Sequence, residues 1–266
     1  APPGCERDES PPLKPLLVCT DFDGTLTDED PSAPLAPGFF SWLQSDPKKG
    51  DVSWVVATGR SWEGLREALL HHHAPAFPEW IVTVEREIHR VQNREAQPVE
   101  AWNQTCTEVH EALFGRHGAI LERIEKEVGS HEDVTVIPDV GAIGLVVESP
   151  AGIAHAEKMV KEILRDRPEI LTVRNGPYFR FAHADYHKGS CLGHVQALLD
   201  LGPASTFIAG DNLNDLSMLQ RRYGHYLACP SNSHAEVLAQ VKREGGYLAK
   251  APGGAGIAES LNFFFR

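Results

Sequence analysis

Residues 16–25 read Leu-Leu-Val-Cys-Thr-Asp-Phe-Asp-Gly-Thr, an apolar run that ends in two carboxylates one residue apart. Such a run predicts a buried strand, and parallel α/β sheets place their active sites at the carboxyl ends of their strands. Asp21 and Asp23 diverge only if the chain curls directly after the strand, and Gly24 gives the freedom for that curl. Two close acids repel each other and need a cation or a shared proton. The alternative is a turn in which the carboxylates cap the next element.

Polar residues with a glycine also follow two other predicted strands. The strand predicted at 205–209 is followed by Gly-Asp-Asn-Leu-Asn-Asp at 210–215, and the strand predicted at 53–57 by Thr-Gly-Arg-Ser at 58–61. In the second case a hydroxyl and backbone N–H groups meet the start of a helix, which suits an anion. Lys188 opens the helix that precedes the strand at 205–209. These groups together predict a site for both Mg²⁺ and a phosphate, because Mg²⁺ takes carboxylate and phosphate oxygens.

These motifs, in this order along the chain, resemble those of the haloacid dehalogenase superfamily of phosphohydrolases. The resemblance runs from Leu16 to about Phe265 and implies a Rossmann-like core with an inserted α+β cap. Within the superfamily, Ala-Thr-Gly-Arg-Ser at 57–61 and a Trp-led helix early in the cap look most like the sucrose-phosphate phosphatase group. The chain departs from that group at residues 85–87, which read Glu-Arg-Glu where the group tends to have Gly-Thr-Glu.

The resemblance implies Mg²⁺ as cofactor and hydrolysis of a phosphate ester through an aspartyl-phosphate. Asp21 is then the expected nucleophile, and Asp23 the group that protonates the leaving oxygen and later activates water. The expected metal site consists of Asp21, Asp23 (through its backbone carbonyl), Asp211 and Asp215, although Asp215 could instead hold a metal-bound water or orient the lysine. The expected phosphate-binding residues are Thr58, Gly59, Lys188 and Asn214. For Asn214 a helix cap is an equally good interpretation.

The predicted elements indicate two domains. Strands and helices alternate through 16–84 and 183–266, which predicts a doubly wound parallel sheet in a catalytic core domain. Residues 85–182 predict a long helix, two strands, an amphipathic helix and two more strands, which is typical of a small α+β cap. Polar residues around the last cap hairpin are candidates for recognising the substrate: Arg174, Asn175, Tyr178 and Arg180. Strand alternation also predicts a solvent-facing set on such a hairpin.

Composition limits the partners and the location. The chain has 266 residues and a net charge of −12, which argues against nucleic acid. It has no apolar run of membrane-spanning length, which predicts that it does not cross a membrane. Residues 1–15 are polar and Pro-rich, so we expect a loose tail and not a secretory signal. The five cysteines form no Cys-x-x-Cys pair and are odd in number, which indicates reduced thiols in a cytoplasmic protein.

Together with the resemblance, these features predict a cytoplasmic, Mg²⁺-dependent phosphatase for a small phosphorylated metabolite, such as a sugar or glycoside phosphate. A capped site excludes water and selects the substrate by its lining, so the protein is expected to act on small molecules. The protein itself is expected to be a monomer or a homodimer. A phosphomutase or phosphotransferase is the alternative among enzymes. A non-catalytic protein that binds a phosphorylated metabolite is the alternative outside them, although all four motifs keep their chemical groups.

Overall fold

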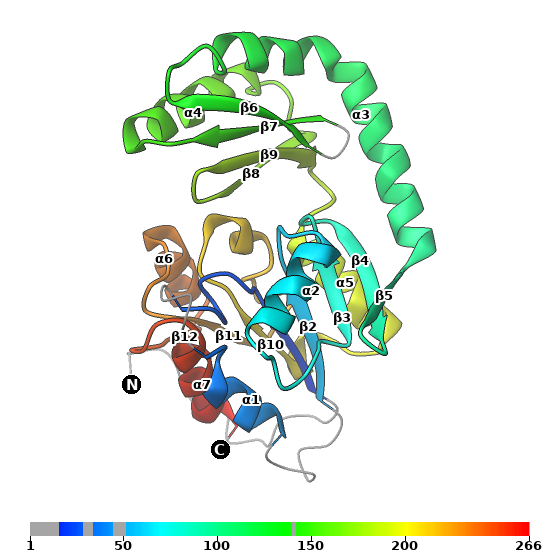
Figure 1. The fold of residues 1–266 in the computed structure, drawn as a ribbon, viewed down its shortest axis with the longest axis vertical. Coiled ribbons are helices and arrows are strands. Elements are labelled where there is room, and N and C mark those ends of the chain that lie inside the picture. The colour runs from blue at the N-terminus through cyan, green and yellow to red at the C-terminus, as the bar shows by residue number, and fades with distance from the viewer. Residues whose placement is uncertain (1–15, 29–33, 45–51, 140–141, 266) are drawn as a thin grey trace. The chain divides into compact units, whose positions relative to one another are not determined.

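The computed structural model describes residues 16–28, 34–44, 52–139 and 142–265. The chain divides into two compact units (Figure 1). The core unit combines the N-terminal part of the chain, up to Val99, with the C-terminal part from Lys188 onward, and the cap unit is Glu100–His187. The tail expected at residues 1–15 lies outside the described residues.

The core unit is built on an eight-stranded sheet in the order β12-β11-β10-β1-β2-β3-β4-β5. Its parallel strands are β1 (Leu16–Thr20), β2 (Val52–Ala57), β3 (Trp80–Thr83), β10 (Thr206–Ala209), β11 (Tyr226–Cys229) and β12 (Tyr247–Leu248). The chain winds outward from β1 to β3, then returns to β10 beside β1 and winds outward the other way. The predicted doubly wound parallel sheet is therefore confirmed. Connections diverge at the carboxyl ends of β1 and β10, the place where such sheets bind their ligands.

Helices cover both faces of this sheet. They are α1 (Pro37–Gln44), α2 (Trp62–His71), α5 (Lys188–Leu198), α6 (Ala235–Arg243) and α7 (Gly253–Phe264). Helices α1, α2 and α7 share one apolar cluster with Val18 and Trp54 of the sheet. Leu17 and Cys19 are equally buried but lie outside that cluster, because alternate strand residues point to the opposite face, where α5 and α6 pack. This two-sided burial explains why β1 reads as a continuous apolar run.

The cap unit has an antiparallel four-stranded sheet in the order β6-β7-β9-β8. Its elements are α3 (Glu100–Glu127), β6 (Val134–Asp139), β7 (Ala142–Val147), α4 (Pro150–Ile163), β8 (Ile170–Asn175) and β9 (Tyr178–His183). Side chains of α3 and α4 pack with Phe179 and Phe181 of β9 in one apolar cluster, so both helices cover the same face. The α+β cap predicted from its alternating pattern is confirmed.

Both predicted boundaries of the cap, and the length of one predicted helix, differ from the structure. The cap was expected to begin at 85, but β4 (Glu87–Gln92) and β5 (Glu95–Pro98) form a hairpin that pairs antiparallel with β3 and extends the core sheet. The division between the units accordingly falls after Val99, and before Lys188 instead of before 183. The helix that the alternation of strands and helices predicts after the motif at 210–215 is only a short 3-10 helix, η3 (Leu213–Ser217).

No helix within the described part of the chain has the length and apolar character needed to cross a membrane. Four cysteines lie in the part of the chain that the structure describes, all of them buried and in no disulfide: Cys19, Cys106, Cys191 and Cys229. Cys5 lies outside the described residues.

Candidate active site

The chain turns directly after β1, as Gly24 predicts. Residues 22–27 close a tight hydrogen-bonded turn in which Gly24 has a φ of 78°. A Cβ at this position would lie 2.5 Å from Oδ2 of Asp211, so both the conformation and the space require glycine. The turn leaves Asp21 only 4% exposed at the end of β1, while the side chain of Asp23 is 39% exposed. The two carboxylates therefore diverge into different environments.

Asp23 is held by an arginine from the neighbouring strand end. Nε and Nη2 of Arg60 donate to the two carboxylate oxygens of Asp23 at 2.8 and 2.7 Å. Arg60 follows Thr58 and Gly59 at the end of β2, and its guanidinium lies over the ring of Phe22. Such a two-pronged pair fixes the direction of the carboxylate more firmly than a single hydrogen bond does.

The loop after β10 positions two further carboxylates. Oδ2 of Asp215 accepts hydrogen bonds from the backbone amides of Asp211 and Asn212, both at 2.9 Å. Gly210 makes room for this contact, because a Cβ there would lie 2.5 Å from Cγ of Asp215. Oδ1 of Asp211 accepts from the hydroxyl of Thr25 at 2.7 Å. The turn after β1 and the loop after β10 thus hold Asp211 between them.

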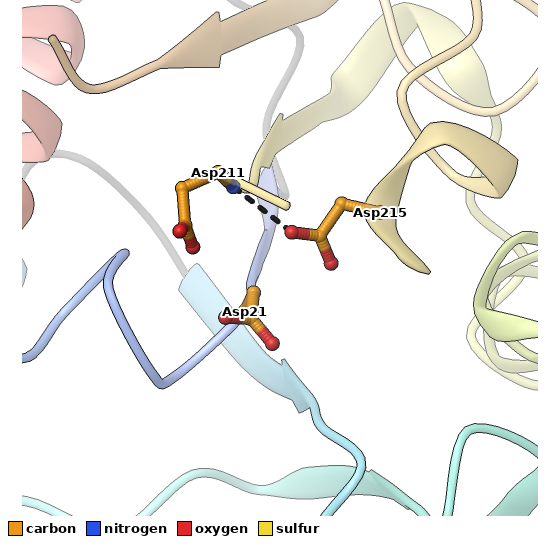
Figure 2. A group of neighbouring side chains, drawn as sticks. All are labelled: Asp21, Asp211 and Asp215. Carbon is orange, nitrogen blue, oxygen red and sulfur yellow. Dashed lines mark hydrogen bonds between the residues drawn. The ribbon is translucent and has the colours of Figure 1, made fainter. Parts of the chain in front are cut away.

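Asp21, Asp211 and Asp215 come together at this edge of the sheet (Figure 2). One carboxylate oxygen of each lies within 4.8 Å of the others. Nζ of Lys188, a fully buried side chain at the start of α5, donates to Oδ1 of Asp21 and to Oδ1 of Asp215, each at 2.7 Å. Residues from three separate parts of the chain therefore form a single charged cluster.

Burial and mutual repulsion set the protonation of this cluster. Burial raises the pKa of Asp21 well above its usual range, and repulsion by the other two aspartates adds to the shift against the attraction of Lys188. Burial and the charge of Asp215 raise the pKa of Asp211 from 3.8 to about 7. Burial alone disfavours the ammonium of Lys188, but Asp21, Asp215 and Glu85 outweigh it and raise its pKa well above the ordinary value. Lys188 therefore stays charged.

The cluster fits a divalent cation. Lys188 neutralises one of three aspartates, so the ionised cluster keeps two negative charges. Burial, together with repulsion among the aspartates, raises the pKa of Asp21 and of Asp211, and a bound cation would favour their ionised forms. Hard carboxylate oxygens in this arrangement are the donors that Mg²⁺ prefers. Asp215 accepts hydrogen bonds from Lys188 and from two backbone amides, so its carboxylate is already in contact with the lysine that it was expected to orient as one of its possible roles.

The expected phosphate-binding residues lie beside the cluster. Thr58 is buried at the end of β2, where its Oγ1 accepts from the amide of Arg60 at 3.1 Å. Ser61 caps the N-terminus of α2 by accepting from the amide of Gly64. Lys188 is the first residue of α5, the helix that precedes β10, and its Nζ donates to Asp21. A hydroxyl and a helix N-terminus thus stand at the carboxyl end of β2, the strand next to β1, and the ammonium contacts Asp21 directly.

Asn214 is not a helix cap, the alternative that its position at the start of a predicted helix left open. The cap of η3 is Asn212, and Asn214 is buried inside the turn that follows it. Its Nδ2 donates to Oε1 of Glu85 at 3.0 Å, and its buried Oδ1 has no hydrogen-bond partner among the described residues. Asn214 therefore keeps one buried acceptor unsatisfied beside Glu85 and Lys188.

Three residues of the site did not emerge as candidates from the sequence: Thr25, Arg60 and Glu85. Thr25 and Arg60 stand inside the motifs at 21–25 and 58–61, so a role in the site could have been assigned from their position. Glu85 carried a weaker signal, because it stands where the sucrose-phosphate phosphatase group tends to have glycine. It is only 3% exposed and has a φ of 72°, and neither its burial nor its left-handed conformation follows from hydrophobic periodicity.

The cap residues divide between the two faces of their sheet. Asn175 pairs with Tyr178, so these two side chains share a face, and Arg180 lies on it too because it follows Tyr178 by two residues. Tyr178 is 54% exposed, and Nε of Arg180 donates to Asp139 at 2.7 Å. This face is opposite to the one that α3 and α4 cover.

Arg174 lies on the other, helix-covered face. It stands opposite Phe179, which belongs to the apolar cluster under the helices, and its Nη1 forms an ion pair with Glu157 of α4. Its Nε also donates to the carbonyl of Gly176. The four cap candidates are therefore not brought together: three share the open face and Arg174 is separated from them.

Comparisons with known proteins agree with this architecture. The family model of sucrose-6F-phosphate phosphohydrolase matches residues 14–125 and 182–265. A glucosylglycerol-phosphate synthase of Pseudomonas anguilliseptica is 24% identical over 259 residues, which cover 94% of this chain. The chain spans only 31% of the length of that relative.

Among solved structures, the sucrose-phosphatase of Synechocystis sp. PCC6803 in complex with sucrose and phosphate has a TM-score of 0.70 at 20% identity and covers 94% of this chain and 97% of its own. A haloacid dehalogenase-like hydrolase of Bacteroides thetaiotaomicron has a TM-score of 0.62 at 16% identity, with 94% and 99% covered. The C-terminal domain of C. albicans trehalose-6-phosphate phosphatase has a TM-score of 0.61 at 13% identity, with 93% and 91% covered. At these identities the likeness shows a shared fold.

Proposed function

Because the chain belongs to the sucrose-6F-phosphate phosphohydrolase family, we propose that it is a Mg²⁺-dependent phosphatase that hydrolyses a small phosphorylated sugar or glycoside. The observation that carries this proposal is the position of Lys188 between Asp21 and Asp215, with Asp211 completing the cluster. The lysine holds one oxygen of Asp21 and leaves the other for a phosphorus atom. An ammonium, a nucleophilic carboxylate and a metal-binding pair are what transfer of a phosphoryl group requires.

Asp21 is the proposed nucleophile and Asp23 the proposed acid and base. A carboxylate oxygen of Asp21 attacks phosphorus, the bond to the sugar oxygen breaks, and Asp23 gives its proton to that oxygen. Water then attacks the aspartyl-phosphate while Asp23 takes a proton from it, which releases phosphate and restores Asp21. Arg60 supports both proton transfers by fixing the orientation of the Asp23 carboxylate.

Asp21, Asp211 and the backbone carbonyl of Asp23 are the proposed metal ligands. Bound Mg²⁺ supplies positive charge that offsets the repulsion between the nucleophile and the phosphate. Lys188, Thr58 and the amide of Gly59 are proposed to bind the phosphoryl oxygens, where negative charge spreads in the transition state. Asp215 then acts as a positioning residue, because it accepts a hydrogen bond from Lys188 and fixes the loop after β10.

The proposed leaving group is a polyhydroxylated sugar or glycoside. The matched family acts on a phosphorylated disaccharide, and the curated relative is named for a phosphorylated glycoside. Asn175, Tyr178 and Arg180 on the open face of the cap sheet are the proposed recognition residues, since their polar groups can hydrogen-bond sugar hydroxyls. The four described cysteines, which are buried thiols outside disulfides, support a location in the reducing cytoplasm.

A phosphate-release assay on a panel of esters tests the proposal. The panel contains sucrose 6F-phosphate, glucosylglycerol phosphate, trehalose 6-phosphate, glucose 6-phosphate and an aryl phosphate, each with Mg²⁺. We expect sustained release of phosphate from at least one sugar ester. Transfer of the phosphoryl group between positions of a sugar without phosphate release would favour a phosphomutase. Binding without either reaction would favour a non-catalytic protein.

A further inference from the structure

Glu85 is an unusual residue at the end of β3. Val84 and Glu85 have φ values of 44° and 72°, in the left-handed region that side chains rarely adopt. Their amides donate to the carbonyls of Arg60 and Thr58, at 3.0 and 3.1 Å, so the loop is tied to the end of β2. Strained backbone of this kind persists where the surrounding structure enforces it, and it concentrates at functional sites.

The carboxylate of Glu85 points into the site and not to solvent. Its Oε1 accepts from Nδ2 of Asn214 at 3.0 Å and would lie 2.7 Å from a Cβ placed at Gly59. Its Oε2 is buried 3.9 Å from Nζ of Lys188 and accepts no hydrogen bond from any described residue. A single carboxylate thus accepts a hydrogen bond from Asn214, faces Lys188 and fills the space that a side chain at Gly59 would need.

Those three residues are among the four expected to bind the phosphoryl group, the fourth being Thr58. A carboxylate and a phosphate are both anions with acceptor oxygens, so they compete for the same donors. Among the described residues, Lys188 is the cation that faces this carboxylate, and its single positive charge is already shared by Asp21 and Asp215. A fourth buried acid beside it is costly unless it serves a purpose.

We infer that the Glu85 carboxylate occupies part of the anion-binding position in the substrate-free protein and is displaced when a phosphoryl group or inorganic phosphate binds. Glu85 is therefore a built-in competitor of phosphate, which weakens product binding and speeds its release. The inference rests on the proposed function only for the identity of the anion. Displacement breaks one hydrogen bond, which Oε1 accepts from Asn214, and the long ion pair of Oε2 with Lys188.

Two variants separate the charge of Glu85 from its shape. Glu85→Gln keeps the size and the acceptor for Asn214 but removes the negative charge. Glu85→Gly removes the side chain and suits the φ of 72°, so it keeps the fold without strain. Glu67→Gln, at an exposed position on α2, is the control for removing a carboxylate elsewhere in the same unit.

The measurement is binding of inorganic phosphate to each protein in the presence of Mg²⁺ by isothermal titration calorimetry. We expect both Glu85 variants to bind phosphate about tenfold more tightly or better, and to lower KM more than they change kcat, because like charges at a buried site repel strongly. Unchanged or weaker phosphate binding, or no binding by any of the proteins, would overturn the inference.

The panel assay and this titration fail independently. Hydrolysis of a sugar phosphate by the wild-type protein without tighter phosphate binding by the variants would refute the role of Glu85 and leave the phosphatase standing. Tighter phosphate binding by the variants without hydrolysis of any ester would support the role of Glu85 and refute the phosphatase.

Discussion

The polar side chains of the core site are held in a different way from those on the open face of the cap sheet. In the core, Asp21 and Asp215 are buried and share the ammonium of Lys188 at 2.7 Å. In the cap, Tyr178 is 54% exposed and Arg180 is partly exposed beside Asp139. Groups fixed before a substrate arrives can do the same chemistry on any phosphate ester. Groups that remain accessible can instead distinguish one leaving group from another.

The largest expected effect follows from removing the nucleophile of the core. Asp21→Asn should lower kcat by roughly 10⁴-fold or more on every ester, because an amide cannot form the aspartyl-phosphate. Steady-state phosphate release with a sugar phosphate and with an aryl phosphate measures the loss. Asp200→Asn, the same change at an exposed position after α5, is the matched control and should keep full activity. More than a few per cent residual activity in Asp21→Asn would contradict the assignment.

Removal of the metal should have the next largest effect. Exhaustive chelation should lower phosphate release by about 10³-fold, and Mg²⁺ should restore it, since the cluster keeps two uncompensated charges. Ca²⁺ should bind but inhibit, because it takes more oxygen ligands at longer distances and misaligns the attack of Asp21. Equal rates with Ca²⁺ and Mg²⁺ would argue against the proposed site.

The stability of the metal-free protein should depend on pH through Asp211. Its pKa is raised from 3.8 to about 7, so the native state binds a proton that the unfolded chain has already released. The stability due to that proton is full below about pH 4, falls as the pH rises and is lost above about pH 7. In Asp211→Asn, the change in the free energy of unfolding across this pH window should be smaller than in the wild-type protein by about 2–4 kcal/mol. Chemical denaturation of both proteins at several pH values without metal measures it, and identical slopes would contradict the shift.

The smallest expected effect distinguishes the cap from the core. Alanine at Asn175, Tyr178 or Arg180 should cost about 1–3 kcal/mol in kcat/KM for the preferred sugar phosphate and almost nothing for an aryl phosphate. Arg174→Ala should show a smaller difference between the two esters, because Arg174 lies on the helix-covered face. Equal losses on both esters would mean that the open-face residues support folding or closure and not recognition.

Much of the core site could be predicted because its residues stand at strand ends. The run at 16–20 required a strand, Gly24 required a turn, and the topology of a doubly wound sheet then brought Asp21 and Asp211 together. The hairpin of β4 and β5 could not be anticipated in this way. Its two-residue loop, Asn93-Arg94, has φ values of 52° and 63°, but it lacks the glycine that usually marks such a turn, and most of β5 is exposed and polar.

The directions in which side chains point were the second feature that the sequence could not predict. The role of Glu85 depends on a left-handed backbone that points its carboxylate inward, and nothing in the local pattern encodes that direction. Arg174 and Asn175 are neighbours on one strand, so they were grouped by sequence although alternation puts them on opposite faces. The register of β8 against β9 decides which of them lies beside Tyr178, and register is a property of the folded sheet.

The most direct test of the account is to find the residue that carries the phosphoryl group. The wild-type protein is mixed with Mg²⁺ and a saturating ester, quenched in acid within the first turnover, and digested for mass spectrometry. We predict one added phosphoryl group on the peptide that contains Asp21, located on Asp21 by fragmentation and absent in Asp21→Asn. A phosphoryl group on another residue, or rapid phosphate release with none on Asp21 at any quench time, would contradict the account.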